Sequence, residues 1–288
     1  MDAILFILDQ KTRVPSVYNL TLDQTSGSHW TSAFLTTITG AQYLALSRIL
    51  GSICKSSLLN LDTLEYSNDL NYGTALQNAT TRTYQNTTAS SSNPAAGFHV
   101  SAGNDYAYNL TWQGTSKVLF NGGNAAFTLG PNFANPTEWS VPASTTSGTL
   151  TLSNIETITI DPARSPSIWS YGFGAPSHQL YQFATIRVGE ELHYVLPFDM
   201  ETRGCSGWTS PKSNITYPQR WELRFENGDV LDIKSLSDTV YAGYVNVSGK
   251  FLGQEVGFGV VEMIKLIGDY PDIKMCWAAC CTLHTGRE

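Results

Sequence analysis

The chain has 288 residues, of which 14% are charged, and it carries a formal net charge of −7. This length is enough for two domains that each bury a core. The acidic balance and the lack of a basic stripe argue against a nucleic-acid partner. No run approaches the roughly 18 apolar residues of a membrane-spanning helix, so we expect no membrane span. The abundance of Ser, Thr, Asn, Gly and Tyr is typical of an all-β protein with many turns.

The first half of the chain predicts several strands. Residues 16–22 predict one strand. Residues 28–40 predict a strand that ends in a turn at Gly40, and residues 42–50 predict the strand that follows the turn. The polar, turn-rich stretch 67–97 predicts a long loop region. Residues 138–142 and 148–160 predict the strands that close this half, and residues 161–166 read as a linker.

Residues 105–112 alternate in a way that separates two faces of a strand. If Asn109 carries a glycan its face must lie outside, which places Tyr108, Leu110 and Trp112 inside a barrel. A Tyr and a Trp inside a barrel either line a ligand pocket or fill the core. Both interpretations stay open at this point.

A weak internal repeat divides the chain. At a constant offset of 149 residues, five of thirteen positions coincide between residues 28–40 and 177–189, namely Ser, His, Phe, Thr and Gly. We interpret this as a duplicated domain, with one domain at residues 1–164 and a second at 165–288.

The second half predicts two hairpins. Residues 219–233 turn about Asn227-Gly228, with Trp221 facing inward. Residues 241–264 form two β-branched and aromatic runs that flank a turn at Gly249-Lys250 and Gly253, and Gly257 and Gly259 interrupt the second run. Glycine inside a strand marks a bend or the close approach of another backbone, which favours a small, strongly curved barrel.

The closing hairpin also carries a family resemblance. The patterns Tyr-x-Gly-x-Val-x-Val-x-Gly and Gly-x-Gly-Val-Val-Glu resemble the last strands of the lipocalin-like carotenoid-hydratase and AttH superfamily. Residues 165–174 lie where that superfamily has a Trp-Tyr-Asp-Arg-Gln-Trp-Gly-like segment between its barrels, although the Asp, Arg and Gln are missing here. The resemblance implies two tandem lipocalin-like antiparallel β-barrels.

Motifs for common catalytic chemistry are absent from the sequence. There is no Gly-x-Ser-x-Gly elbow, phosphate-binding loop, His-Glu-x-x-His or dinucleotide fingerprint. His29 and His178 occupy equivalent strand starts, which favours a repeated structural hydrogen bond over catalysis. His193 is a better candidate for a polar group in a pocket. We find no strong carboxylate pair for acid and base work.

These absences favour a reaction without proton transfer, because the missing Asp and Arg remove the proton donor that a hydratase needs. The chain looks most like the fungal hetero-Diels–Alderases of tropolone–sesquiterpene biosynthesis, which implies joining of a tropolone quinone methide to a humulene-type terpene. No metal or cofactor is required. The resemblance implies Tyr108 or His193 as the catalytic donor. The expected substrate-binding walls are aromatic: Trp30, Trp112, Trp139, Trp169, Tyr171 and Trp221.

Two other functions remain open. A lipocalin-like carrier of a hydrophobic ligand would use the same aromatic residues without a donor. A hydratase or cyclase would retain acid catalysis through Glu262 or Asp199.

Six glycosylation sequons favour the secretory pathway or the extracellular space, at Asn19, Asn78, Asn86, Asn109, Asn214 and Asn246. Residues 1–10 do not form a signal peptide, so either a leader has been removed or the protein is cytoplasmic with idle sequons. Cys54 and Cys205 either pair or remain buried thiols. The group Cys276, Cys280, Cys281 and His284 lacks matching ligands elsewhere, so we expect no metal.

Overall fold

The structure is a computed structural model. It describes residues 27–50, 53–72, 76–77, 81–84, 87–90, 97–102, 106–116, 118–120, 137–152, 156–173, 182–188, 191–195, 207–211, 214, 216–224, 228–236, 242–251 and 254–263. The chain forms two compact units that divide after Ala175, which we call the N-terminal and C-terminal units. Apart from one 3₁₀ turn, the described elements are strands, and all described strand pairs are antiparallel, which confirms the predicted all-β class.

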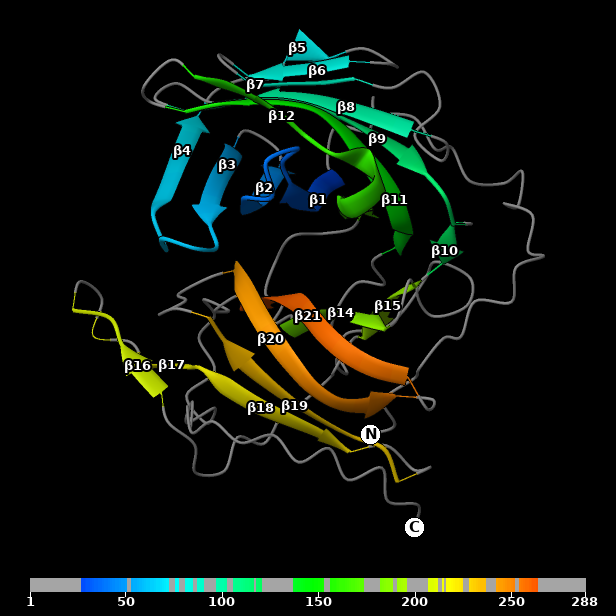
Figure 1. Cartoon of the computed structure of the whole chain (residues 1–288). Helices are drawn as coiled ribbons and strands as arrows, with labels where there is room; N and C mark the ends of the chain where they lie inside the picture. Colours follow the sequence, from blue (N-terminus) through cyan, green and yellow to red (C-terminus); the bar gives the residue numbers. More distant parts are fainter. Residues whose placement is uncertain are drawn as a thin grey trace. The chain divides into compact units, whose positions relative to one another are not determined.

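The N-terminal unit is one antiparallel sheet of 13 strands that curls on itself (Figure 1). Its main path runs β4-β3-β2-β1-β13-β11-β9-β8-β7-β6-β5, and β10 and β12 pair with β11. The strands are β1 (Gly27–Thr36), β2 (Gln42–Leu50), β3 (Ile53–Asn60), β4 (Tyr66–Tyr72), β5 (Leu76–Gln77), β6 (Thr81–Tyr84), β7 (Thr87–Ser90), β8 (Gly97–Ala102), β9 (Ala107–Gly114), β10 (Leu119–Phe120), β11 (Thr137–Thr151), β12 (Thr157–Thr159) and β13 (Pro166–Phe173).

The C-terminal unit holds a six-stranded antiparallel sheet in the order β15-β14-β21-β20-β19-β18, and a separate pair, β16 and β17. The strands are β14 (Gln182–Val188), β15 (Glu191–Val195), β16 (Gly207–Thr209), β17 (Thr216–Pro218), β18 (Arg220–Arg224), β19 (Val230–Ser235), β20 (Ala242–Phe251) and β21 (Gln254–Met263). Both predicted hairpins are confirmed, because β18 pairs with β19 and β20 pairs with β21.

A close backbone approach in the last hairpin lies at Gly249, which is inside β20 rather than at the turn where we expected it. Gly249 has a φ of +118°, and a Cβ there would overlap the carbonyl oxygen of Val230. A Cβ at Gly257 would meet nothing within 4 Å. Gly249 is therefore the glycine that lets β20 pass close to β19, beside a register shift between Asn246 and Lys250.

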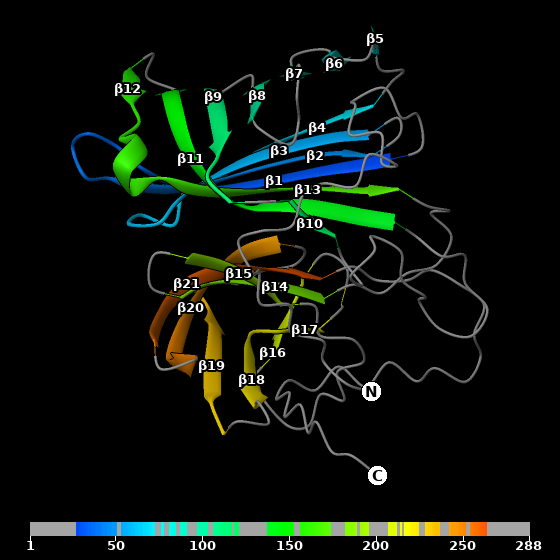
Figure 2. The same cartoon turned by 90° about the vertical axis from the view of Figure 1, so that its right-hand side faces the viewer.

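The core of the N-terminal unit fills the inside of the curled sheet. Figure 2 shows β8 and β9 crossing the direction of β1–β4. Apolar side chains of β1, β2 and β3 pack against apolar side chains of β8, β9 and β11. The first set is Ala33, Leu35, Tyr43, Ala45, Ile49, Cys54 and Leu58, and the second is Val100, Ala102, Tyr108, Leu110, Trp112, Val141 and Leu150. The predicted inward face of β9 is confirmed, because Tyr108, Leu110 and Trp112 are buried while Asn109 is exposed.

The long strand β11 pairs with β13 along its first part and with β9 along its second part. Residues 137–145 pair with β13, and residues 144–151 pair with β9. A register shift between Val141 and Ser144 places a β-bulge at Pro142, a position where a proline without an N–H is tolerated. Ala143, within the bulge, donates its N–H to Ser116 Oγ at 3.1 Å. The bulge lets one strand change partners without leaving these backbone groups unpaired.

Both units share one strand topology, as a duplication predicts. In each sheet the first strand pairs with the next strand and with the last one: β1 with β2 and β13, and β14 with β15 and β21. The orders β13-β11-β9-β8 and β21-β20-β19-β18 then match strand for strand. The aligned segments 28–40 and 177–189 contain β1 and β14, the equivalent opening strands.

The division between the units differs from the sequence-based boundary by one strand. We expected residues 165–174 to open the second domain, but β13 lies inside the N-terminal sheet, between β1 and β11. The Pro-rich segment before it, Asp161-Pro-Ala-Arg-Ser-Pro166, predicted a linker. Its backbone instead makes the tight 3₁₀ turn η2 (Pro162–Arg164) that leads into β13.

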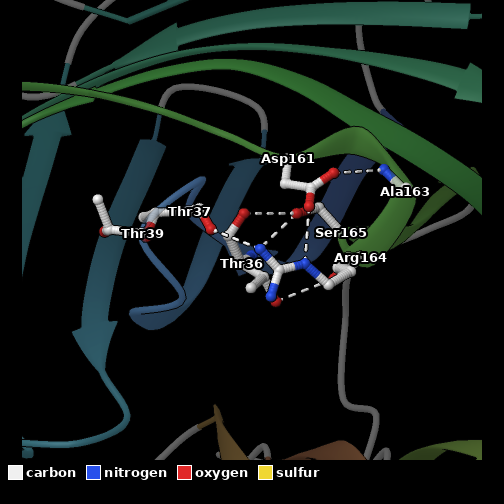
Figure 3. Close-up of polar contacts among 7 residues, drawn as sticks. All are labelled: Thr36, Thr37, Thr39, Asp161, Ala163, Arg164 and Ser165. Atoms are coloured by element: carbon white, nitrogen blue, oxygen red, sulfur yellow. Dashed lines mark hydrogen bonds and ion pairs between the residues drawn. The ribbon is translucent and has the colours of Figure 1, made fainter.

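A set of polar contacts, which we call the clasp, ties the start of β13 to the end of β1 (Figure 3). Ser165 Oγ accepts a hydrogen bond from the Thr36 N–H at 2.9 Å and donates to the Thr36 carbonyl at 3.2 Å. Arg164 donates to Asp161 Oδ2 at 2.7 Å and to the Thr37 carbonyl at 3.1 Å. The clasp therefore fixes one end of the β1–β13 pair.

The predicted loop at 67–97 is wrong in part, because β4 to β7 lie within it. β4 shows why the sequence misleads. Most of its side chains are exposed or half-buried, so its residues can be polar while its backbone pairs with β3. Its apolar residues Tyr66, Leu70 and Tyr72 lie on the exposed face, so the strand lacks the usual pattern of an apolar buried face and a polar outer one.

Candidate functional site

Cross-strand register places the candidate residues of the N-terminal unit in rows on the inner face of the sheet. Strand partners share a face, and so do residues two apart along a strand. We define the histidine row as Trp139, Tyr171, His29, Ile49 and Cys54, and the serine row, two residues further along, as Val141, Trp169, Thr31, Ser47 and Ser56. Ile49, Cys54 and Val141 belong to the core, which identifies this face as the interior.

The serine row meets two tyrosines that reach across from β9 and the residue before it. Tyr106 Oη donates to Ser56 Oγ at 3.2 Å, and Tyr108 Oη donates to the Leu46 carbonyl at 2.9 Å. Thr31 Oγ1 donates to the Ser47 carbonyl at 3.3 Å. The two tyrosine bonds join opposite walls, and the Thr31 bond joins the neighbouring strands β1 and β2. Together they place several hydroxyl groups inside an otherwise apolar core.

Burial keeps both phenols protonated. Desolvation raises the pKa of Tyr108 well above 10, Tyr106 and Cys54 add to the rise, and hydrogen bonds from Ser47 and Ser56 oppose it. Desolvation likewise raises the pKa of Tyr106, against a hydrogen bond from Ser56. The two tyrosines can therefore donate hydrogen bonds near neutral pH but cannot act as phenolate bases.

The predicted site residues fall into separate groups. Tyr108 and Trp112 are 2% and 3% exposed in the core, and Trp139, Trp169 and Tyr171 occupy the two inner rows. Trp30 lies on the opposite face of β1, half-buried, with the Arg48 guanidinium 5.9 Å from its ring centre.

The other predicted residues belong to the C-terminal unit. His193 lies on β15, and Trp221 is 2% exposed on β18, where it pairs with the buried Ile233. Trp221 therefore packs in the core of that sheet. Glu262 pairs with Phe183 in the backbone register of β14 and β21. Asp199 lies outside the described residues.

The Tyr108 hydroxyl, which we expect to activate a substrate, is hydrogen-bonded within the protein in this structure. Tyr108 Oη donates a hydrogen bond to the Leu46 carbonyl of β2, and its side chain is fully enclosed. It joins the two walls of the unit.

Sequence reasoning missed Tyr106, Ser47 and Ser56. A signal was present, because serines interrupt the apolar alternation of both inner strands. On β2 the inner positions read Tyr, Ala, Ser, Ile, and on β3 they read Cys, Ser, Leu. Small polar residues on a buried face require hydrogen-bond partners, and here Tyr106, the residue before β9, is the partner of Ser56.

Three sequons fall on described and exposed residues, Asn109, Asn214 and Asn246, while Asn19, Asn78 and Asn86 lie outside the described part. Cys54 is a buried thiol in the core, and Cys205 and the cysteines after it are also outside that part. Within the described residues no cluster of His, Cys, Asp or Glu has the arrangement of a metal site. The described segments likewise contain no helix long and apolar enough to cross a membrane.

Comparison with known proteins identifies relatives across most of the chain. No family model matches the sequence. Kievitone hydratase of Fusarium solani subsp. phaseoli is 26% identical over 307 aligned positions, which cover 87% of each chain. Dehydratase asqC of Emericella nidulans is 25% identical over 318 positions, covering 88% of this chain and 90% of that protein.

Two solved structures share the fold. Kievitone hydratase from Nectria haematococca superposes with a TM-score of 0.74 at 22% identity, covering 87% of this chain and 93% of that one. A protein assigned as AttH from Nitrosomonas europaea gives a TM-score of 0.65 at 13% identity, covering 89% and 100%. The chain therefore has the lipocalin-like, all-β fold of kievitone hydratase and AttH, and it is related in sequence to fungal hydratase and dehydratase enzymes.

Proposed function

We propose that the chain adds water to, or removes water from, a carbon–carbon double bond of a small hydrophobic molecule. The observation that carries this proposal is the pair of relatives, a hydratase and a dehydratase, each aligned over nearly nine-tenths of the chain. The two reactions are one equilibrium in opposite directions. In hydration a proton joins one alkene carbon, the oxygen of water bonds to the other, and the second proton of that water returns to a base.

His29 is the proposed proton carrier. Its strand partners are Tyr171 on β13 and Ile49 on β2, and Ile49 is a core residue, so the register puts position 29 on the inner face. An imidazole has an ordinary pKa near 6.5 and both gives and takes protons near neutrality. The sequence alone favoured a structural hydrogen bond for His29, because His29 and His178 occupy equivalent strand starts.

Solvent labelling tests the reaction. The protein is incubated with kievitone, or with other hydrophobic alkenes and alcohols, in water enriched in ¹⁸O and in deuterium oxide. Hydration adds one ¹⁸O and one deuterium to the product, and dehydration releases the oxygen to solvent. An alkene that turns over without gaining solvent label, or an alcohol that turns over and keeps its hydroxyl oxygen, contradicts the proposal. A lack of any turnover across such substrates favours a carrier.

A histidine pair provides the matched variants. His29→Gln is expected to lower kcat at least a hundredfold and to remove the pH dependence near neutrality, within the usual range for general acid–base groups. His99→Gln changes a partly exposed histidine bonded to Thr111, and its rate should match that of wild type. An unchanged rate in His29→Gln would assign the proton transfer to another group.

A cycloaddition is the second candidate, favoured by the aromatic positions Trp139, Tyr171 and Trp169 in adjacent inner rows. Flat aromatic faces can stack a tropolone quinone methide beside a humulene-type terpene. Holding two reactants in register contributes about 7–11 kcal/mol. A Diels–Alder reaction takes neither ¹⁸O nor deuterium from solvent, so the labelling experiment separates the two candidates.

We also propose passage through the secretory pathway, with glycans on the exposed Asn109, Asn214 and Asn246. Protein from a eukaryotic host should lose mass on treatment with a peptide N-glycanase, and peptide mapping should place the modification at these sequons. An unchanged mass, together with recovery from the cytoplasm, would refute this localisation.

A further inference from the structure

Three buried hydroxyl groups in the N-terminal unit have no hydrogen-bond partner among the described residues. They are Ser32 Oγ on β1, Thr146 Oγ1 on β11 and Ser167 Oγ on β13, and all three residues are 0% exposed. Ser32 lies on the opposite face of β1 from the core residue Ala33, so Thr146 and Ser167 are the two on the inner face. Ser167 pairs with Ser144, which lies two residues before Thr146 on the same face of β11. Buried hydroxyls in folded proteins almost always have a partner, so two orphans beside one another point to a bound molecule.

Small side chains line the same place. We define the alanine row as Ser144, Ser167, Ala33, Ala45 and Leu58, which are consecutive partners across β11, β13, β1, β2 and β3. Four of these five side chains are small, and those four are each 5% exposed or less. This row lies beside the serine row on the inner face, two residues after it on β1 and two residues before it on β2.

We propose that Thr146 and Ser167 hold one or two ordered waters inside the N-terminal unit, with Ser144 beside them. A buried water needs two to four polar partners, and hydroxyls both donate and accept. Resting on the proposed function, we further assign this site as the place from which the reacting water reaches the substrate. Ser167 precedes Trp169 of the serine row by two residues, about 7 Å along the strand.

A high-resolution crystal structure tests the site independently of any activity. We expect a density peak about 2.6–3.2 Å from both hydroxyl oxygens. An empty site, or hydroxyls that bond only to backbone carbonyls, would overturn the inference even if the protein proves to be a hydratase. A filled site in a protein without hydratase activity would refute the proposed function and leave the water site standing.

Kinetics test the role of the water. The double variant Thr146→Val and Ser167→Ala keeps the shapes and removes both hydroxyls, and we expect kcat for ¹⁸O incorporation to fall at least tenfold with KM unchanged. Thr145→Val is the matched control. Thr145 is half-buried and pairs with Pro166, and it lies on the opposite face of β11 from Ser144 and Thr146. Equal kcat in the double variant and the control would refute the assignment of this water to the reaction.

Discussion

The clasp at the start of β13 gives the sharpest stability prediction. Ser165 is 0% exposed, and its hydroxyl makes two hydrogen bonds with the backbone of Thr36, as acceptor at 2.9 Å and as donor at 3.2 Å. In Ser165→Ala the Thr36 N–H loses this acceptor while it stays buried. The Thr36 carbonyl keeps the Asp161 N–H at 2.8 Å, so the loss falls mainly on one donor.

An orphaned buried donor costs about 1–3 kcal/mol. For a unit of this size, a loss of about 2 kcal/mol lowers Tm by roughly 4–8 °C. Urea unfolding followed by circular dichroism measures the free energy of unfolding, and hydrogen exchange at the Thr36 amide should show the loss of protection locally.

Thr157→Ala is the control for this experiment. Its hydroxyl lies 3.4 Å from that of Thr151 in an exposed contact, so the change should cost less than about 0.5 kcal/mol. If Ser165→Ala is as stable as Thr157→Ala, the clasp does not hold β1 and β13 together.

Three further changes probe the same unit. Gly148→Ala puts a Cβ onto a carbonyl oxygen of β9 at a φ of +132°, whereas Gly228→Ala, in the C-terminal unit, meets open space at +88°. In urea unfolding we expect Gly148→Ala to lower the free energy of unfolding by about 2–3 kcal/mol more than Gly228→Ala, and equal losses would refute the close contact. Tyr108→Phe removes the hydrogen bond from Tyr108 Oη to the Leu46 carbonyl and should cost about 1 kcal/mol with kcat nearly unchanged, so a collapse of kcat would support Tyr108 as a donor to substrate. Burial lowers the pKa of His99, so the unfolded state binds more protons just below pH 6.5; stability should fall as pH drops through that window, and His99→Gln should flatten the curve.

The fold class was predictable because its signals are local. Glycine turns, β-branched runs and the alternation in residues 105–112 each specify a strand or a hairpin, and β9, β18–β19 and β20–β21 follow them. Strands β4 to β7 were missed, since a largely polar strand is specified by its neighbours rather than by its own sequence.

The candidate site was predictable only in part, because rows across a sheet depend on register. The sequence marks Trp139, Trp169 and Tyr171 as aromatic, but the partnership of Tyr171 with His29 spans most of the unit and leaves no local pattern. The same holds for Tyr108, which looked like a donor to substrate until its carbonyl partner on β2 was located. Polar groups inside a core are understood only when both walls are known.

The pairing of the opening strand with the final strand has a consequence for biosynthesis. Thr36 and Ser165 are 129 residues apart, so β1 leaves the ribosome long before its partner exists. During that interval one edge of β1 has no neighbour, and closing so large a loop is slow. We expect the nascent N-terminal unit to depend on chaperones until translation has passed residue 173, and a fragment that stops before β13 should aggregate rather than fold.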